Sequence, residues 1–251
     1  MNYTRRGFAS RLGMYVGGAT VGAAWAAAAS SPQEHEHEEH SKQPMTTHAS
    51  GSSEDRLAAS EQVWGKLVEG NNRFVTGKTL ARDVVARRSA VLSGQQPQVV
   101  VLGCSDSRVS PSVIFDQGLG DVLEVRTVGN VVDSVGLGSI EYALVHMPIR
   151  VLVILGHERC GAVKAAASGE KMPTPSLQAI VDKIAPALAN LQGDHKSREF
   201  LLKAVAANVG QCAVDLLANS PIVLRETAAS NVQIVKAIYS LATGKVTRVA
   251  G

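Results

Sequence analysis

Two short apolar segments stand out in the hydrophobic pattern of the chain. Residues 99–102 and 151–155 consist only of Val, Ile and Leu, with no polar residue inside either segment. Unbroken apolar runs of this length are typical of strands buried on both faces of a parallel sheet. A further strand is predicted at 122–127. The segment 231–239 is the last strand candidate, possibly antiparallel at one edge of the sheet.

Helical periodicity fills the stretches between these strands. From Ser53 onward, apolar residues recur at spacings of three and four, with Ser53 as a candidate cap. Strands that alternate with helices predict an α/β fold. We expect a single domain with a mainly parallel central sheet of four to five strands, flanked by helices, and an amino-terminal helical arm. Further helices are predicted at 84–92, 139–146, from Cys160, at 176–191 with a kink or an interruption at Pro186, and at 197–218.

Side chains that can bind a metal follow two of the predicted strands. Cys104 and His157 each come directly after a glycine at a strand end. Because the carboxyl ends of parallel strands meet at one edge of a sheet, these side chains can be neighbours in space. Cys160, at the start of a predicted helix, can face the same ion. Two thiolates and one imidazole suit zinc, whose fourth position is either open to water or taken by a carboxylate.

Asp106 and Arg108 lie between these ligands in the proposed site. The guanidinium of Arg108 can hold the Asp106 carboxylate through two parallel hydrogen bonds. Held in this way, Asp106 can accept a hydrogen bond from hydroxide on the metal. If Arg108 releases it, Asp106 becomes a possible fourth ligand.

These residues together resemble the beta-class carbonic anhydrases. The resemblance rests on Cys104 to Arg108 and His157 to Gly161 and extends over roughly 61–249. It implies one zinc ion per subunit, held by Cys104, His157 and Cys160, with Asp106 and Arg108 as catalytic residues. It also implies reversible hydration of carbon dioxide to bicarbonate and a proton by zinc-bound hydroxide. Shorter matches occur in the same order at 72–77, 115–121, 125–130, 138–142 and 238–244.

The same resemblance indicates substrate-binding positions and a branch of the family. In another branch Asp106 closes the metal site, and Arg126 matches an arginine of its bicarbonate site. The match of Gln95 favours the plant-like branch and the open form. The helical arm implies a homodimer or a higher even homo-oligomer. The positions that match the plant-like substrate pocket are Gln95, Leu123, Val128, Gly129 and Tyr142.

The first 55 residues differ in character from the rest. Residues 1–29 contain Arg5-Arg6 and then an uncharged run rich in Ala and Gly, which resembles a twin-arginine export signal. This predicts a periplasmic or otherwise exported protein with no stable membrane span after cleavage; the alternative is a retained anchor helix. Residues 30–55 predict a disordered linker rich in His and acidic residues, followed by the catalytic domain at 56–251. Within the linker, His35, His37 and His40 either bind metal weakly or belong to a solvated spacer.

Composition and charge limit the number of domains and the classes of function that the chain can have. With 251 residues, 45% of them hydrophobic, the chain can form one sizeable core beside a leader. Without the three arginines of the leader, 22 basic residues balance 22 acidic ones, so nucleic acid is not an expected partner. The three cysteines form no Cys-x-x-Cys motif, which disfavours a redox role. Two alternatives remain: a non-catalytic zinc-binding or storage protein, and a hydrolase of carbonyl sulfide or carbon disulfide with the same fold.

Overall fold

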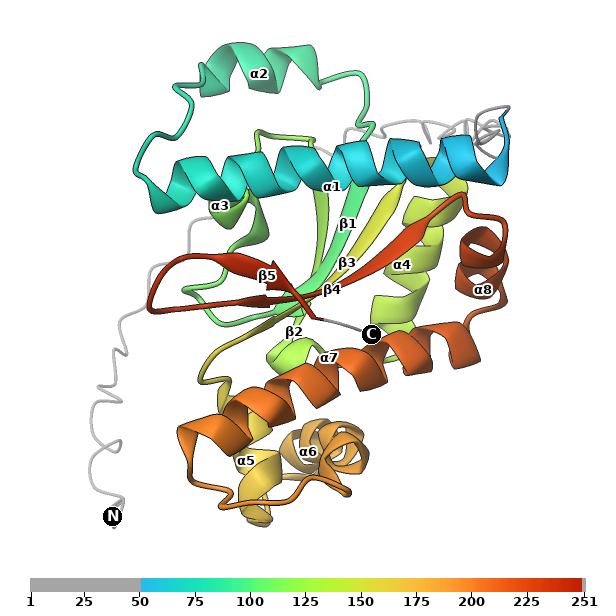
Figure 1. Ribbon diagram of the computed structural model, residues 1–251. Coiled ribbons are helices and arrows are strands. Elements are labelled where there is room, and N and C mark those ends of the chain that lie inside the picture. The colour runs from blue at the N-terminus through green and yellow to red at the C-terminus, as the bar shows by residue number, and fades with distance from the viewer. Residues whose placement is uncertain (1–50, 250–251) are drawn as a thin grey trace, which may run out of the picture. The chain divides into compact units, whose positions relative to one another are not determined.

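The computed structural model describes residues 51–249, and a sheet of five strands forms the centre of this part of the chain (Figure 1). The predicted signal and histidine tract lie outside the described residues. The strand order is β2-β1-β3-β4-β5, and β1 to β4 are parallel. The strands are β1 (Val99–Cys104), β2 (Val122–Thr127), β3 (Val151–His157), β4 (Gln233–Tyr239) and β5 (Val246–Arg248).

The strand predicted at 231–239 does not take the antiparallel direction that the sequence left open. β4 runs parallel to β3, and the antiparallel edge strand is β5, which the sequence did not predict. A long helical crossover separates β3 from β4, and such crossovers connect parallel strands. β5 follows β4 after a short turn, so it runs antiparallel. With only three residues, β5 is too short for its hydrophobic pattern to be recognised.

The helices agree with the periodicity, with shifts at their ends. The cap of α1 is Ser52 rather than Ser53, and Ser52 and Asp55 form a reciprocal capping box. The helix therefore includes the last residues of the predicted linker. α4 begins five residues before the predicted position, and α6 continues past Pro186. The helices are α1 (Ser53–Val75), α2 (Val84–Ala90), α3 (Pro111–Ile114), α4 (Ser134–His146), α5 (Gly161–Ser168), α6 (Pro175–Leu188), α7 (Arg198–Asn219) and α8 (Pro221–Ala228).

Helices cover both faces of the sheet, which explains why its central strands have no polar positions. Val99 and Val101 of β1 pack towards α1 and α3, whereas Val100 and Leu102 pack towards α4, α7 and α8. Every residue of β1 and β3 is buried. Figure 1 shows α1 across one side of the sheet and α7 across the other. The unbroken apolar runs are therefore confirmed as strands covered on both faces.

The long helix α7 packs very closely on β3. A Cβ atom on Gly156 would lie 2.6 Å from Val209 and 3.0 Å from Val205, so a glycine is required where the helix crosses the strand. By length and composition α7 could cross a membrane. Its buried residues instead pack in the core of the domain, among them Val205, Val209 and Leu216.

The predicted amino-terminal arm consists of two different parts. α1 buries Val63, Trp64 and Leu67 against its own sheet. α2 buries no residue within the described chain and stands apart from the sheet in Figure 1. Val85 on α2 is 64% exposed, and Leu92 after it is 86% exposed. This segment therefore presents apolar side chains that its own domain does not cover.

Candidate metal centre

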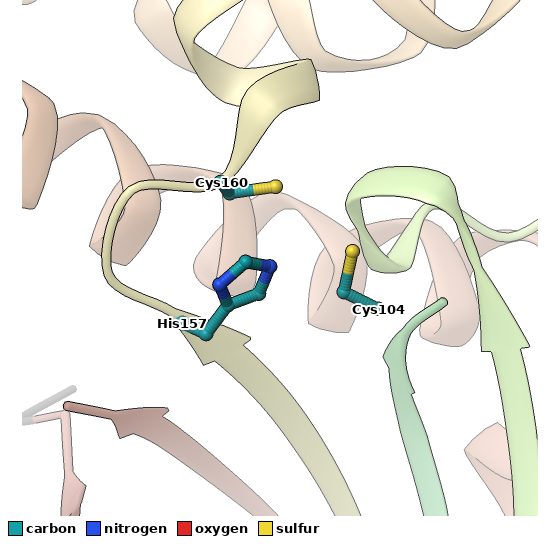
Figure 2. A group of neighbouring side chains, drawn as sticks. All are labelled: Cys104, His157 and Cys160. Atoms are coloured by element: carbon teal, nitrogen blue, oxygen red, sulfur yellow. The ribbon is translucent and has the colours of Figure 1, made fainter. Parts of the chain in front are cut away.

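The fold brings Cys104, His157 and Cys160 together at the carboxyl edge of the sheet. Cys104 ends β1 and His157 ends β3, and these strands are parallel neighbours. The ligand atoms of the three residues all lie within 4.8 Å of one another. Figure 2 shows the two sulfur atoms and the imidazole directed towards a common space. All three residues are at most 4% exposed.

A tight turn connects His157 to Cys160. Arg159 has a φ of 56°, a left-handed conformation that is uncommon outside glycine. The turn leads into α5, and Cys160 is the cap residue of that helix. The carboxylate of Glu158 accepts hydrogen bonds from Ser240 Oγ at 3.0 Å and from Arg198 at 3.4 Å. The turn is thereby fastened to the β4–β5 connection and to the start of α7.

The imidazole of His157 is oriented for coordination. Its Nδ1 lies 2.9 Å from the carbonyl oxygen of Glu158, which can only accept, so Nδ1 carries the proton. Nε2 is buried and has no hydrogen-bond partner among the described residues. A buried nitrogen lone pair without a partner is costly unless something binds it. A cation held by Nε2 and two sulfurs satisfies that need, and this donor set fits zinc.

The side chains of Cys104 and Cys160 shift each other's pKa in opposite directions. A hydrogen bond from Cys160 lowers the pKa of Cys104, and the same contact raises the pKa of Cys160. A divalent cation binds the deprotonated sulfurs, so metal binding should weaken as pH falls.

A second turn contributes a backbone donor to Cys104. The N–H group of Gly129 lies 3.3 Å from Cys104 Sγ. Gly129 has a φ of 73°, and a Cβ atom there would lie 2.9 Å from the side chains of Ala162 and Ile184. Both the backbone conformation and the close packing therefore require glycine at this position.

Asp106 and Arg108 form the predicted pair. Arg108 donates from Nε to one carboxylate oxygen at 2.9 Å and from a terminal nitrogen to the other at 2.7 Å. These hydrogen bonds lower the pKa of Asp106 below its usual range, in spite of the opposing effect of burial. Arg126 donates to the carbonyl oxygens of Cys104 and Asp106, at 3.0 and 2.7 Å. Its guanidinium therefore supports the backbone of the loop that carries Asp106.

The predicted substrate residues fall into two groups. Val128 and Gly129 lie in the turn beside Cys104. Leu123 on β2 pairs with Val100 on β1. Val100 lies four residues before Cys104, so Leu123 is about 13 Å from Cys104 along the strand direction. Gln95 precedes β1 and lies at the opposite edge of the sheet from the metal ligands. Within one chain, Gln95 and Leu123 are therefore not brought to the metal centre.

These distant residues line two neighbouring surface hollows. Tyr142, on α4, contributes to both and is 57% exposed. One hollow, of about 830 Å³, includes Gln95 and His146. The other, of about 550 Å³, includes Leu123 and Arg126. The resemblance pointed to Gln95, Leu123 and Tyr142 as substrate-binding residues. It did not indicate that they line hollows without the metal ligands of their own chain.

The sequence did not reveal the residues that support the turn beside Cys104. Asn208 on α7 is 1% exposed and donates to the carbonyl oxygen of Gly129 at 2.9 Å. Asn130 has a φ of 49° and exchanges hydrogen bonds with Cys212. One signal was available, because Asn208 occupies an apolar position in the helical pattern of α7. A polar residue on a buried helix face normally has a specific partner.

Comparison with known proteins agrees with this geometry. A family model described as carbonic anhydrase matches residues 99–246, more than half of the chain. Carbonic anhydrase of Mycolicibacterium smegmatis is 38% identical over 188 residues, which cover 73% of this chain and 90% of that protein. Carbonic anhydrase 2 of Mycobacterium tuberculosis is 38% identical over 189 residues, covering 73% and 89%.

Solved structures give the same result. The beta-carbonic anhydrase of Coccomyxa, solved in complex with acetazolamide, superposes with a TM-score of 0.59 at 25% identity. The match covers 80% of this chain and 87% of that one. Sequence, fold and the Cys/His/Cys group thus agree, and the chain belongs to the carbonic anhydrase family, in its beta class.

Proposed function

We propose that the protein catalyses the reversible hydration of carbon dioxide to bicarbonate and a proton, with one zinc ion per subunit. The observation that carries this proposal is the convergence of Cys104, His157 and Cys160 within 4.8 Å, with Nε2 of His157 left without a partner among the described residues. Zinc bound there acidifies a coordinated water, so that a nucleophile is available near neutral pH.

The Asp106–Arg108 pair supplies the polar groups of the reaction. Because Arg108 donates to both carboxylate oxygens of Asp106, the carboxylate would stay ionised and would not be free to bind the metal. In this open form the carboxylate can accept a hydrogen bond from the attacking oxygen and so orient its lone pair. We propose this open form, as in the plant-like branch.

We further propose that the active site is completed by a second subunit. Val128 and Gly129 line the site of their own chain. Gln95, Leu123 and Tyr142 match the substrate pocket but line hollows that include none of the proposed metal ligands of their own chain. A partner subunit that presents these residues resolves this mismatch. The uncovered apolar side chains of α2 and Leu92 provide the surface for such a contact.

Stopped-flow carbon dioxide hydration by the zinc-loaded protein tests the proposed activity. Activity should be present in the wild type and absent from Cys160→Ala, which loses one ligand and its metal. Cys212→Ala, a change of the same size in a cysteine outside the ligand group, should keep one zinc per subunit. We also expect acetazolamide to inhibit the wild type.

Other outcomes of the same assay identify the alternatives. Stoichiometric zinc without hydration activity, together with easy loss of the metal to chelators, indicates a zinc-binding or storage protein. Turnover of carbonyl sulfide or carbon disulfide in preference to carbon dioxide indicates a hydrolase with the same fold. Absence of stoichiometric metal contradicts the proposal as a whole.

We also propose that the protein is exported by the twin-arginine route. The support is the Arg5-Arg6 pair and the uncharged run after it. Replacing both arginines by lysine should retain the precursor in the cytoplasm, as measured by cell fractionation. Amino-terminal sequencing of the exported wild type should find a mature end after Ala29. Export that is unaffected by the double replacement contradicts this route.

A further inference from the structure

We infer that Asn208 on α7 is a positioning residue for the metal ligand Cys104 and acts through the backbone of Gly129. The inference rests on the metal binding proposed above. Asn208 touches none of the proposed ligands. It is nevertheless 1% exposed, and its side-chain amide is directed at the turn that contacts Cys104.

The contact path contains only one intermediate residue. Asn208 Nδ2 donates to the carbonyl oxygen of Gly129 at 2.9 Å and lies 3.5 Å from Asn130 Oδ1. The N–H group of Gly129 donates to Cys104 Sγ at 3.3 Å. Gly129 therefore accepts from α7 through its carbonyl and donates to the metal ligand through its amide.

The turn needs this support because of its backbone conformation. Gly129 and Asn130 are both left-handed, with φ of 73° and 49°. Glycine adopts this conformation without steric cost but also leaves it easily, because it has no side chain to restrict φ and ψ. The N–H group and the carbonyl of Gly129 belong to the two peptide groups on either side of its Cα atom. By holding the carbonyl, Asn208 restrains the rotation about Gly129 that would turn its N–H group away from the sulfur.

The position of α7 is itself tied to a ligand strand. Val205 and Val209 lie on either side of Asn208 in the helix, and both pack against Gly156, directly before His157. A side chain at 156 would force α7 away from β3. The glycine that precedes His157 thus allows the same helix to reach the turn beside Cys104.

A hydrogen bond to a metal-bound sulfur changes how strongly that sulfur donates. An N–H donor stabilises the sulfur lone pairs, and such contacts tune the properties of thiolate-bound metals. Loss of the contact should make Cys104 a stronger donor. The absorption that transfers charge from sulfur to a bound transition metal should then move to longer wavelength.

Cys212 provides a matched comparison on the same helix. It lies one turn after Asn208 and contacts the same buried turn, because it receives a hydrogen bond from Asn130 at 3.4 Å and donates to the Asn130 carbonyl at 3.3 Å. It makes no hydrogen bond to Gly129. Cys212→Ala therefore removes a buried polar contact to the turn while leaving the path from Asn208 to Cys104 intact.

Cobalt substitution of the full-length protein tests the inference. In Asn208→Ala and Asn208→Leu, the sulfur-to-cobalt band should move to longer wavelength. The affinity for Co²⁺ in competition with a chelator should fall about 10-fold, because the turn beside Cys104 is held less firmly. Cys212→Ala should leave the band in its wild-type position. Asn208→Leu fills a similar volume without a hydrogen-bond donor, so it serves if the alanine variant does not fold.

An unshifted band in a folded Asn208 variant, or an equal shift in Cys212→Ala, overturns the inference. The wild type offers a test that needs no variant. Bound NMR-active cadmium should couple to the Gly129 amide proton through the hydrogen bond, and absence of that coupling also overturns it. Failure of the wild type to bind Co²⁺ contradicts the proposed metal centre instead.

Discussion

Several residues at the candidate metal centre contribute through their backbone groups. Gly129 contributes an N–H donor, Glu158 contributes the carbonyl that orients His157, and Arg159 contributes a left-handed turn. The metal ligands and the Asp106–Arg108 pair were predicted from side-chain chemistry and spacing. The backbone contacts were not, because nearly any sequence carries the same N–H and C=O groups.

The pairing of Asp106 with Arg108 gives a prediction for activity. In Arg108→Ala the pKa of Asp106 should rise towards its ordinary value, and the freed carboxylate can reach the metal. We expect kcat/KM for carbon dioxide hydration at pH 8 to fall roughly 10- to 100-fold with zinc retained. Lys203→Ala removes a surface cation paired with Glu199 and is the control. Unchanged kcat/KM in Arg108→Ala would rule out this role for the pair.

At the scale of elements, glycine positions decide how closely α1 approaches the rest of the domain. A Cβ atom on Gly70 would lie 1.8 Å from the carbonyl oxygen of Phe115, whereas one on Gly65 would meet nothing within 4 Å. Both glycines belong to the same helix. They therefore form a matched pair in which only the packing environment differs.

We expect opposite effects from alanine at these two glycines. Gly70→Ala should destabilise the domain by about 1–3 kcal/mol or more, because the helix must move off the Phe115 turn. Gly65→Ala should stabilise it by about 0.5–1 kcal/mol through helix propensity. Urea unfolding followed by circular dichroism measures both. Equal effects of the two substitutions would refute close docking of α1.

A buried carboxylate fastens the same helix and gives a dependence on pH. The side chain of Asp116 is 3% exposed and pairs with Arg73 at 2.6 Å and Arg82 at 2.5 Å. Burial raises the pKa of Asp116, but the hydrogen bonds from Arg82 and Arg73 outweigh that effect and lower it to about 2. The carboxylate thus stabilises the fold above its unfolded pKa, near 3.8, and this contribution disappears as pH falls towards 2.

Acid unfolding of Asp116→Asn tests this contribution. The wild type should lose on the order of 2 kcal/mol of stability between about pH 4 and pH 2 through this group. The variant should be less stable at pH 7 and should lack that part of the pH dependence. Asp182→Asn, on the surface of α6, is the control. If the two variants have the same acid profile, Asp116 does not anchor α1 in this way.

The elements themselves were largely predictable, for identifiable reasons. The strands β1 and β3 are apolar throughout because helices cover both of their faces, and such runs are recognisable in a sequence. Strand direction is different. Nothing in the composition of 231–239 distinguishes a parallel from an antiparallel neighbour, and the direction follows only from the length of the connection before it.

At the scale of the whole molecule, α2 and Leu92 expose apolar side chains that the rest of the described chain does not cover. α2 has no buried residue within the described chain, and Leu92 is 86% exposed. The substrate-matching residues Gln95 and Tyr142 line a hollow beside this segment. No pattern in the sequence could have placed Gln95 and Tyr142 in this hollow, because their position relative to the metal ligands is fixed only when the chain folds.

Disruption of this surface should separate the subunits. We expect the wild type to sediment as a dimer or larger even oligomer, and Leu92→Asp to shift it towards monomer with loss of hydration activity. Leu224→Asp adds the same charge at an exposed position of α8 and should change neither property. A fully active monomeric Leu92→Asp protein would show that each chain contains a complete site.

The placement of the ligands on two strands also has a consequence for biosynthesis. Cys104 and His157 are separated in the chain by β2 and α4 and become neighbours only when β1 and β3 pair. A nascent polypeptide that has emerged only as far as α4 therefore possesses one ligand and nowhere to retain an ion. The proposed metal can therefore be retained only after β3 and Cys160 have been translated and β3 has paired with β1.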